Sequence, residues 1–302
     1  MSRRRRLEIV RGRKVIAQPQ HAATVITKQV QPELPKDTGN VELSTAVWDR
    51  VRRTRLALGI TCAPRPGEPT LARTIGSLRA AGFREQITVF LQGNQLSPRQ
   101  IVEMDSNIIV DTGCTQNGCV YNWTHAARTL LKTDVPWIIL MQDDIEWCDN
   151  AADVIQYTIN RIDKHGDIQR HRLGMLAAYT SPAMVDPAVH GIGWTEARFY
   201  GHTTSLWGAL ALCFPRESLQ AVLDNKRFKD HDSHRALDYV VGDVMRNFCQ
   251  PPKYVKVHVP SIVEHTGDNS TLFDKTTAAN KSLNALRHGY KYSKGGPPWR
   301  KV

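Results

Sequence analysis

The sequence has few cysteines and lacks the spacings that would give them a structural role. Its six cysteines include no Cys-x-x-Cys pair, the spacing shared by many zinc sites and dithiol redox sites. Disulfide frameworks are typical of short secreted chains, whereas this chain has 302 residues. The cysteine pattern therefore predicts scattered, reduced thiols in a cytoplasmic protein and excludes a disulfide-stapled or zinc-stapled scaffold.

Long apolar runs are also missing. No stretch approaches the roughly 18 residues that a membrane span needs, and no apolar segment follows the basic start at residues 1–6, as it would in a secretory signal. Hydrophobic residues make up 41% of the chain and charged residues 23%, which is the balance of a globular domain with a sizeable core. We therefore expect a protein without a membrane segment or signal peptide.

Acidic residues are absent from the C-terminal end. Residues 281–302 carry a net charge of +6 and residues 1–55 carry +8, while residues 56–280 carry −3. Basic ends on a nearly neutral body predict a polyanionic partner, with nucleic acid the first candidate. The alternative is a pair of solubilising tails. We accordingly divide the chain into a basic N-terminal arm (1–55), one domain (56–275) and a basic C-terminal tail (276–302).

Between these ends, apolar runs of strand length alternate with helical patterns. This alternation predicts an α/β domain with a mostly parallel sheet, built from right-handed βαβ units and flanked by helices. The expected strands are 56–61, 87–91, 107–110, 137–141, 173–178, 206–214 and 255–260. The expected helices are 69–82, 122–131, 151–163, 215–223 and 234–248. The glycine- and aromatic-rich residues 191–201 are expected to form a loop, either a lid or an ordinary packed surface loop.

The most informative stretch is residues 137–145, where a buried-looking strand ends in Asp143 and Asp144. Open α/β sheets bind their ligands at the carboxyl ends of their strands. Two adjacent carboxylates repel each other unless a cation lies beside them, and hard oxygen ligands suit Mg²⁺ or Mn²⁺. The pair therefore predicts a metal site that carries phosphates, and the alternative is an acidic loop without a ligand.

The order of these segments resembles the GT-A fold of nucleotide-sugar-dependent glycosyltransferases, over residues 56 to about 273. Residues 59–65 are similar to the nucleotide-binding start of that fold, and residues 142–144 occupy the place of its acidic Asp-x-Asp motif. The resemblance implies that the donor is bound by Thr61, Ala63, Arg65, Asp143 and Asp144. The sequence departs from the motif at Gln142, where the first aspartate would stand, so the metal needs another ligand.

Two further segments carry the resemblance. Residues 207–216 are similar to the small-residue segment on the acceptor side, which assigns Trp207, Gly208 and Ala209 to that side. Residues 259–270 resemble the closing segment of several such enzymes, whose histidine completes the metal site; here it is His265. The metal would thus be held by Asp144 and His265. The alternative for His265 is an ordinary core or surface histidine.

The resemblance also implies a catalytic base. Asp243 matches the aspartate of the Gly-Asp element that serves as base in inverting members, and the alternative is a helix-surface or capping carboxylate. Asp238 lies about 140° away round the same helical stretch, so both carboxylates cannot fill one role. The donor would be a nucleotide sugar such as UDP-glucose, together with Mn²⁺ or Mg²⁺.

A looser likeness joins residues 59–83 and 259–270 to the TET-associated glycosyltransferases of bacteriophages. It implies that the acceptor is 5-hydroxymethylcytosine in DNA, that the basic ends contact phosphates, and that the protein works in the cytoplasm of a host cell. Two alternatives remain at this point. One is a GT-A glycosyltransferase acting on a polysaccharide or a protein. The other, kept open by Gln142, is a relative that has lost catalysis and binds nucleic acid.

Overall fold

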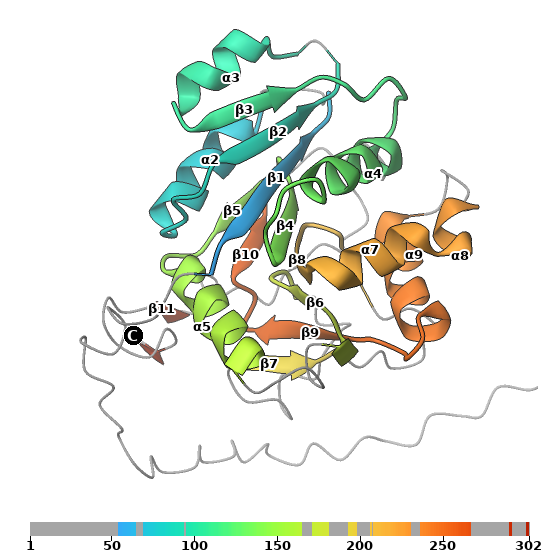
Figure 1. Cartoon of the computed structure of the whole chain (residues 1–302). Coiled ribbons are helices and arrows are strands. Elements are labelled where there is room, and N and C mark those ends of the chain that lie inside the picture. The colour runs from blue at the N-terminus through green and yellow to red at the C-terminus, as the bar shows by residue number, and fades with distance from the viewer. Residues whose placement is uncertain are drawn as a thin grey trace, which may run out of the picture. The chain divides into compact units, whose positions relative to one another are not determined.

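One large sheet organises the part of the chain that the structure describes. The computed structural model describes residues 54–64, 69–93, 95–164, 171–180, 193–197, 206, 208–230, 236–266, 290–291 and 300–301. Eight strands lie in the order β3-β2-β1-β4-β8-β6-β9-β7 (Figure 1). They are β1 (Leu56–Cys62), β2 (Ile87–Leu91), β3 (Ile108–Asp111), β4 (Trp137–Gln142), β6 (Leu173–Ala177), β7 (Gly193–Glu196), β8 (Ala211–Pro215) and β9 (Tyr254–Val259).

Strand direction confirms the expected mostly parallel sheet. The pairs β1–β2, β1–β4, β2–β3 and β6–β9 are parallel, whereas β8 runs antiparallel to both β4 and β6, and β7 runs antiparallel to β9. Six of the eight strands therefore point the same way. Their carboxyl ends lie along one edge, which is where an open α/β sheet binds its ligands.

Helices cover both faces of this sheet. The helices are α2 (Leu71–Ala80), α3 (Pro98–Met104), α4 (Cys119–Leu130), α5 (Ala151–Lys164), α7 (Arg216–Asp224), α8 (Lys226–Lys229) and α9 (Leu237–Asp243). Buried residues of α2, α3 and α5 belong to one core, and those of α4, α7, α8 and α9 to the other. The expected α/β class with helices on both faces is confirmed.

Strand β4 shows why its sequence is apolar throughout. Trp137, Ile139 and Met141 join the first core, while Ile138 and Leu140 join the second. Successive side chains of a strand point to opposite faces, so a strand covered on both faces is apolar at every position. This places the polar end of β4, and the two aspartates after it, at the ligand-binding edge.

The expected loop at residues 191–201 is wrong in part. Residues 193–196 form the edge strand β7, paired with β9, and the expected positions outside residues 193–197 lie outside the described part of the chain. Trp194 packs edge-on against His258 of β9, with ring centroids 5.2 Å apart. The glycine and aromatic residues did not predict a strand here, because the strand is short and its pairing partner lies about sixty residues away.

Two other expected elements differ in extent. The expected strand 206–214 is shorter, because residues 208–210 precede β8 without strand structure. The expected helix 234–248 is divided into α9 and a π-helical segment, Val244–Phe248. Helix α3 was not predicted from the sequence; it begins with a capping box between Ser97 and Gln100.

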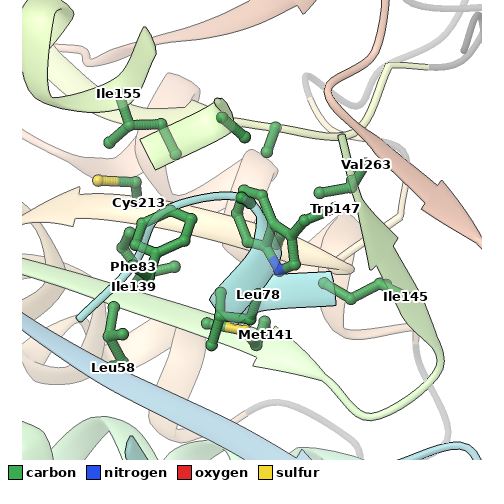
Figure 2. Packing of buried hydrophobic residues seen from close by; sticks show 14 of the residues in the cluster. Leu58, Leu78, Phe83, Ile139, Met141, Ile145, Trp147, Ile155, Cys213 and Val263 are labelled. Carbon is green, nitrogen blue, oxygen red and sulfur yellow. The ribbon is translucent and has the colours of Figure 1, made fainter. Parts of the chain in front are cut away.

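Two short strands missed in the sequence lie beside the sheet. Strand β5 (Ile145–Trp147) pairs antiparallel with β10 (Val263–His265). Trp147 anchors this pair, because its ring packs edge-on against Phe83 with centroids 5.0 Å apart, inside the core shown in Figure 2. The β5–β10 pair is therefore packed against the first core. Its strand β5 begins directly after the two aspartates.

Outside this body, the described residues are few. Strands β11 (Tyr290–Lys291) and β12 (Arg300–Lys301) form an antiparallel pair in the predicted C-terminal tail. The predicted N-terminal arm up to residue 53 lies outside the described residues. Among the residues that are described, we find no helix with the length and apolar character of a membrane span.

Candidate functional site

Asp143 and Asp144 form a buried turn at the carboxyl end of β4. Their exposed fractions are 2% and 1%. The hydroxyl of Thr74, on α2, lies 2.8 Å from the carbonyl oxygen of Asp143 and 2.7 Å from that of Ile145, and it accepts a hydrogen bond from the Ile145 amide at 3.3 Å. Helix α2 therefore holds the backbone of the turn that carries both carboxylates.

The structure brings His265 and Asp144 together. Nε2 of His265 lies 2.8 Å from Oδ2 of Asp144. The contact follows from strand register, because His265 pairs with Ile145, the residue after Asp144. Thr266 adds two hydrogen bonds to the Asp144 carbonyl, from its amide at 2.8 Å and from its hydroxyl at 3.1 Å.

The geometry of this pair fits a hexacoordinate divalent cation. Ligands at about 2.1 Å in an octahedron leave about 3.0 Å between neighbouring ligand atoms, which is close to the observed 2.8 Å. A carboxylate oxygen and an imidazole nitrogen suit Mn²⁺ and are also compatible with Mg²⁺ through oxygen. Within the described residues no group of three or more His, Cys, Asp or Glu side chains gathers. Phosphate oxygens and water would therefore fill the other positions.

The predicted donor side lies next to this pair. Thr61 is in register with Gln142, and its hydroxyl donates to the Met141 carbonyl at 3.2 Å. Ala63 follows the end of β1 and is half-buried. Arg65 lies outside the described residues. The end of β1 and the acidic turn thus adjoin, and the assignment of the donor to them stays a prediction.

One cation of this region was missed in the sequence. Arg73, exposed in the first turn of α2, donates through Nη2 to the Thr266 carbonyl at 3.1 Å. Nearby, the hydroxyl of Thr70 at the start of α2 is buried and has no hydrogen-bond partner among the described residues. Helix N-termini bind phosphate through their free amides. The signal in the sequence was the helix that follows the first strand after a short loop.

The predicted acceptor segment meets the end of β4. The amide of Gln142 donates to the Leu210 carbonyl at 2.9 Å. Ala209 is buried, and Trp207 lies outside the described residues. Gly208 has φ +84°, and a Cβ there would stand 3.1 Å from the ring of Tyr179. Glycine is therefore required at 208 both by its backbone conformation and by the packing of Tyr179.

Asp238, which was not the predicted base, contacts this acceptor segment. Its Oδ2 accepts a hydrogen bond from the Gly208 amide at 2.6 Å, and its Oδ1 accepts one from the Tyr239 amide at 2.9 Å. Burial raises the pKa of the Asp238 carboxyl above its ordinary value, against the opposing effect of these backbone hydrogen bonds. A half-buried carboxylate with a raised pKa has the properties of a general base.

Asp243, the predicted base, has a different environment at the other end of α9. Its Oδ1 accepts a hydrogen bond from Asn247 at 2.7 Å, and its Oδ2 lies 3.9 Å from Nε of Arg227. In the described part of the chain, no hydrogen bond or ion pair joins Asp243 to residues 208–210. The local geometry therefore favours Asp238 for contact with an acceptor.

Hydrogen bonds and short chain segments connect the candidate metal ligands with the candidate base. His265 contacts Asp144, two residues after Gln142. Gln142 contacts Leu210, two residues after Gly208, whose amide binds Asp238. The candidate metal ligands and the candidate base thus belong to one region at the carboxyl edge of the sheet.

Comparison with known proteins gives likenesses of structure alone. No protein-family model and no curated protein sequence matches this chain. Mannose-1-phosphate geranyltransferase from Thermus thermophilus is similar over 67% of this chain and 73% of its own, with 10% identity and a TM-score of 0.43. A cytidylyltransferase from Leptospira borgpetersenii serovar Hardjo-bovis is similar over 64% and 69%, with 14% identity and a TM-score of 0.33. At these values neither likeness carries an argument about the activity of this chain.

Proposed function

We propose that this protein is a metal-dependent glycosyltransferase that moves a sugar from a nucleoside-diphosphate sugar to a hydroxyl group. The observation that carries the proposal is the 2.8 Å contact of Asp144 with His265 at the carboxyl end of β4. A carboxylate and an imidazole brought together at the carboxyl end of a strand suit a cation whose remaining ligands come from the substrate's phosphates.

Asp144 and His265 hold the metal in this proposal. The bound cation, Mn²⁺ or Mg²⁺, supplies Lewis-acid stabilisation of the departing pyrophosphate. Thr74 holds the backbone of Asp143 and Ile145, and Thr266 holds the carbonyl of Asp144, which limits the reorganisation needed when the donor binds. Arg73 and the start of α2 add positive potential on the donor side, so charge neutralisation does not depend on two ligands alone.

Asp238 acts as the base. It removes the proton from the acceptor hydroxyl as that oxygen attacks the sugar carbon, while the bond from the sugar carbon to the phosphate oxygen breaks. The raised pKa of Asp238 strengthens it as a proton acceptor, because basicity and pKa rise together. The Gly208 amide orients the carboxylate toward the acceptor segment. A base that assists attack from the face opposite the leaving group fits an inverting reaction.

For the acceptor, we propose 5-hydroxymethylcytosine in DNA. The basic ends, at +8 for residues 1–55 and +6 for residues 281–302, favour a polyanion over a neutral sugar polymer. The hydroxymethyl group lies in the major groove, and a closed site would reach it by base flipping. A polysaccharide or protein acceptor is the alternative, and salt sensitivity separates the two because neutral sugars release no counterions.

The test is turnover with Mn²⁺ and a series of nucleotide sugars, beginning with UDP-glucose, on DNA with and without 5-hydroxymethylcytosine. Nucleoside masses after digestion give the readout. A hexose-sized gain on the modified DNA alone supports the whole proposal. Metal-dependent hydrolysis of a nucleotide sugar without transfer to DNA retains the glycosyltransferase and discards the DNA acceptor. DNA binding without either reaction points to the degenerate relative that Gln142 keeps open.

A further inference from the structure

A groove runs along the outer face of α4, away from the sheet. Two adjoining cavities form it, of about 350 Å³ and about 410 Å³, and both are lined by Arg128 and Lys229. The first also contains Tyr121 and His125, beside residues 113–116 after β3. The second extends to Lys132 and to Asp224 of α7. Helix α4 therefore forms one wall, and α7 and α8 form the other.

The charge of this groove is positive. Its charged lining residues in the described part of the chain are Arg128, Lys132, Lys229 and Asp224. Asp224 lies 4.0 Å from Nζ of Lys229, and both side chains are at least half exposed, so this pair is weak. Within the described residues the Arg128 guanidinium and the Lys132 ammonium have no ion pair. Arg128, on the last turns of α4, and Lys132, in the turn that follows it, both line the second cavity.

Capping of α4 does not explain the presence of Arg128 and Lys132. Arg216 is the cation that caps the carboxyl end of α4, donating to the carbonyls of Leu131 and Thr133. Arg128 and Lys132 are exposed and are left for solvent or a ligand. An arginine and two lysines along an open groove, with an exposed tyrosine at one end, match the features of a surface that binds a nucleic-acid backbone.

Most of this groove lies away from the carboxyl edge of the sheet, where the donor's phosphates are expected. Helix α4 begins near the carboxyl edge of the sheet, after β3, and runs toward the opposite edge. Arg128 is nine residues beyond Cys119, or about 13 Å along the helix, while Asp144 stays at the carboxyl edge. A phosphate at Arg128 therefore belongs to a second molecule or to an extended one.

The groove follows α4 from its first turn. The first cavity includes Val120, the second residue of the helix, and the second cavity reaches Leu131, just past its end. A chain lying in the groove would thus run along the length of α4. The span from Val120 to Leu130 is about 15 Å, room for about four nucleotides at 3.4 Å each.

We propose that the groove between α4 and α8 binds the phosphodiester backbone of a nucleic-acid acceptor, through Arg128, Lys132 and Lys229. The identity of the occupant as acceptor rests on the proposed function, whereas the binding itself does not. The basic ends of the chain would add contacts of their own. The groove would set the path of the strand along α4.

The test compares binding of an unmodified 20-base-pair DNA duplex by the full-length protein and by Arg128→Ala/Lys229→Ala. Fluorescence anisotropy at several salt concentrations gives the affinity and its salt slope. Loss of two phosphate contacts should weaken binding about tenfold at low salt and lower the slope of log K against log salt by about 1.8. The charge-keeping variant Arg128→Lys/Lys229→Arg should stay within about threefold of the parent.

A matched control removes two exposed cations on the other face, Arg161→Ala/Lys164→Ala on α5. It carries the same basic ends and the same net charge as the groove variant. Equal weakening in both variants, or no weakening in the groove variant, overturns the proposal. A loss of UDP affinity in the groove variant without a loss of DNA affinity overturns it too, since the groove would then serve the donor. Because the probe is unmodified DNA, failure of sugar transfer leaves this result standing.

Discussion

The backbone amide of Gly208 lies 2.6 Å from Oδ2 of Asp238, and this hydrogen bond ties the segment before β8 to the first turn of α9. Gly208 can present its amide in this direction because its φ of +84° lies in the left-handed region, which other residues seldom adopt. The position of the candidate base therefore depends on a glycine thirty residues earlier in the chain.

Replacing Asp238 by Asn tests its role as base. Asn keeps one oxygen, which can accept from the Gly208 amide, but cannot take a proton, so we expect kcat to fall about 10²- to 10⁴-fold. The second hydrogen bond, from the Tyr239 amide, is lost in this variant, so its folded state is checked by its melting temperature. Asp243→Asn is the matched control and should keep kcat within about threefold of the parent, since its carboxylate contacts Asn247 and Arg227. The reverse ranking of the two variants would restore Asp243 as the base.

The pH profile offers a separate test of the same carboxyl. Burial raises the pKa of Asp238 above its ordinary value of 3.8, and a base must be ionised. Turnover should therefore be lost as pH falls through this raised pKa, at a higher pH than an ordinary aspartate would give. An acidic limb that remains unchanged in the residual activity of Asp238→Asn would assign the limb to another group.

Stability follows from the same shift. A carboxyl whose folded pKa is raised binds its proton more tightly in the folded state, so its contribution is greatest at low pH and is lost as pH rises through the folded pKa. Asp238→Asn should remove this loss. The comparison is made by denaturant unfolding of both proteins at several pH values, and parallel curves would contradict the assigned shift.

The sequence was sufficient for the elements that cover both faces of the sheet. Strand β4 is apolar at each of its first five positions, Trp137 to Met141, because both its faces are buried, and its length and position were predicted within one residue. The same pattern located Asp143 and Asp144 at the ligand-binding edge. A long strand that is buried on both faces can be predicted from sequence because it is a nearly continuous apolar run.

The sequence was insufficient where long-range pairing decides the structure. Strand β10 has only three residues, and it forms by pairing with β5 more than a hundred residues earlier. His265 was nevertheless predicted to lie beside Asp144, where the structure has it, through resemblance to a family and not through any local pattern. The choice between Asp238 and Asp243 depends on which one meets Gly208, and no spacing along one helix contains that information.

Metal binding can be measured without turnover. Asp144→Asn removes the charged ligand, and His265→Ala removes the imidazole that lies 2.8 Å from it. We expect each change to weaken Mn²⁺ binding at least tenfold, measured by calorimetry in the presence of UDP, because removal of either group leaves one protein ligand. Glu146→Gln is the control. Glu146 lies on β5 beside the site, paired in register with Glu264, and its replacement keeps the backbone pairing. Equal affinity in all three variants would contradict the assignment.

Trp147 should support the metal site from inside the core. It is 3% exposed and packs edge-on against Phe83. Replacing it by Ala should cost about 3–5 kcal/mol of unfolding free energy and should also weaken Mn²⁺ binding in the fraction that remains folded, because β5 loses its anchor beside Asp144.

Trp123 gives the comparison that separates general destabilisation from a local effect. It is 2% exposed and packs against Phe214 and Phe228 in the other core, so Trp123→Ala should cost a similar amount of stability. Unfolding is followed in urea, and Mn²⁺ affinity is measured at a concentration of urea where both variants are fully folded. If the Trp123 variant loses metal affinity as strongly as the Trp147 variant, the core does not act on the site through β5. A loss confined to the Trp147 variant shows that one buried ring sets the distance between two candidate ligands that lie 121 residues apart in the chain.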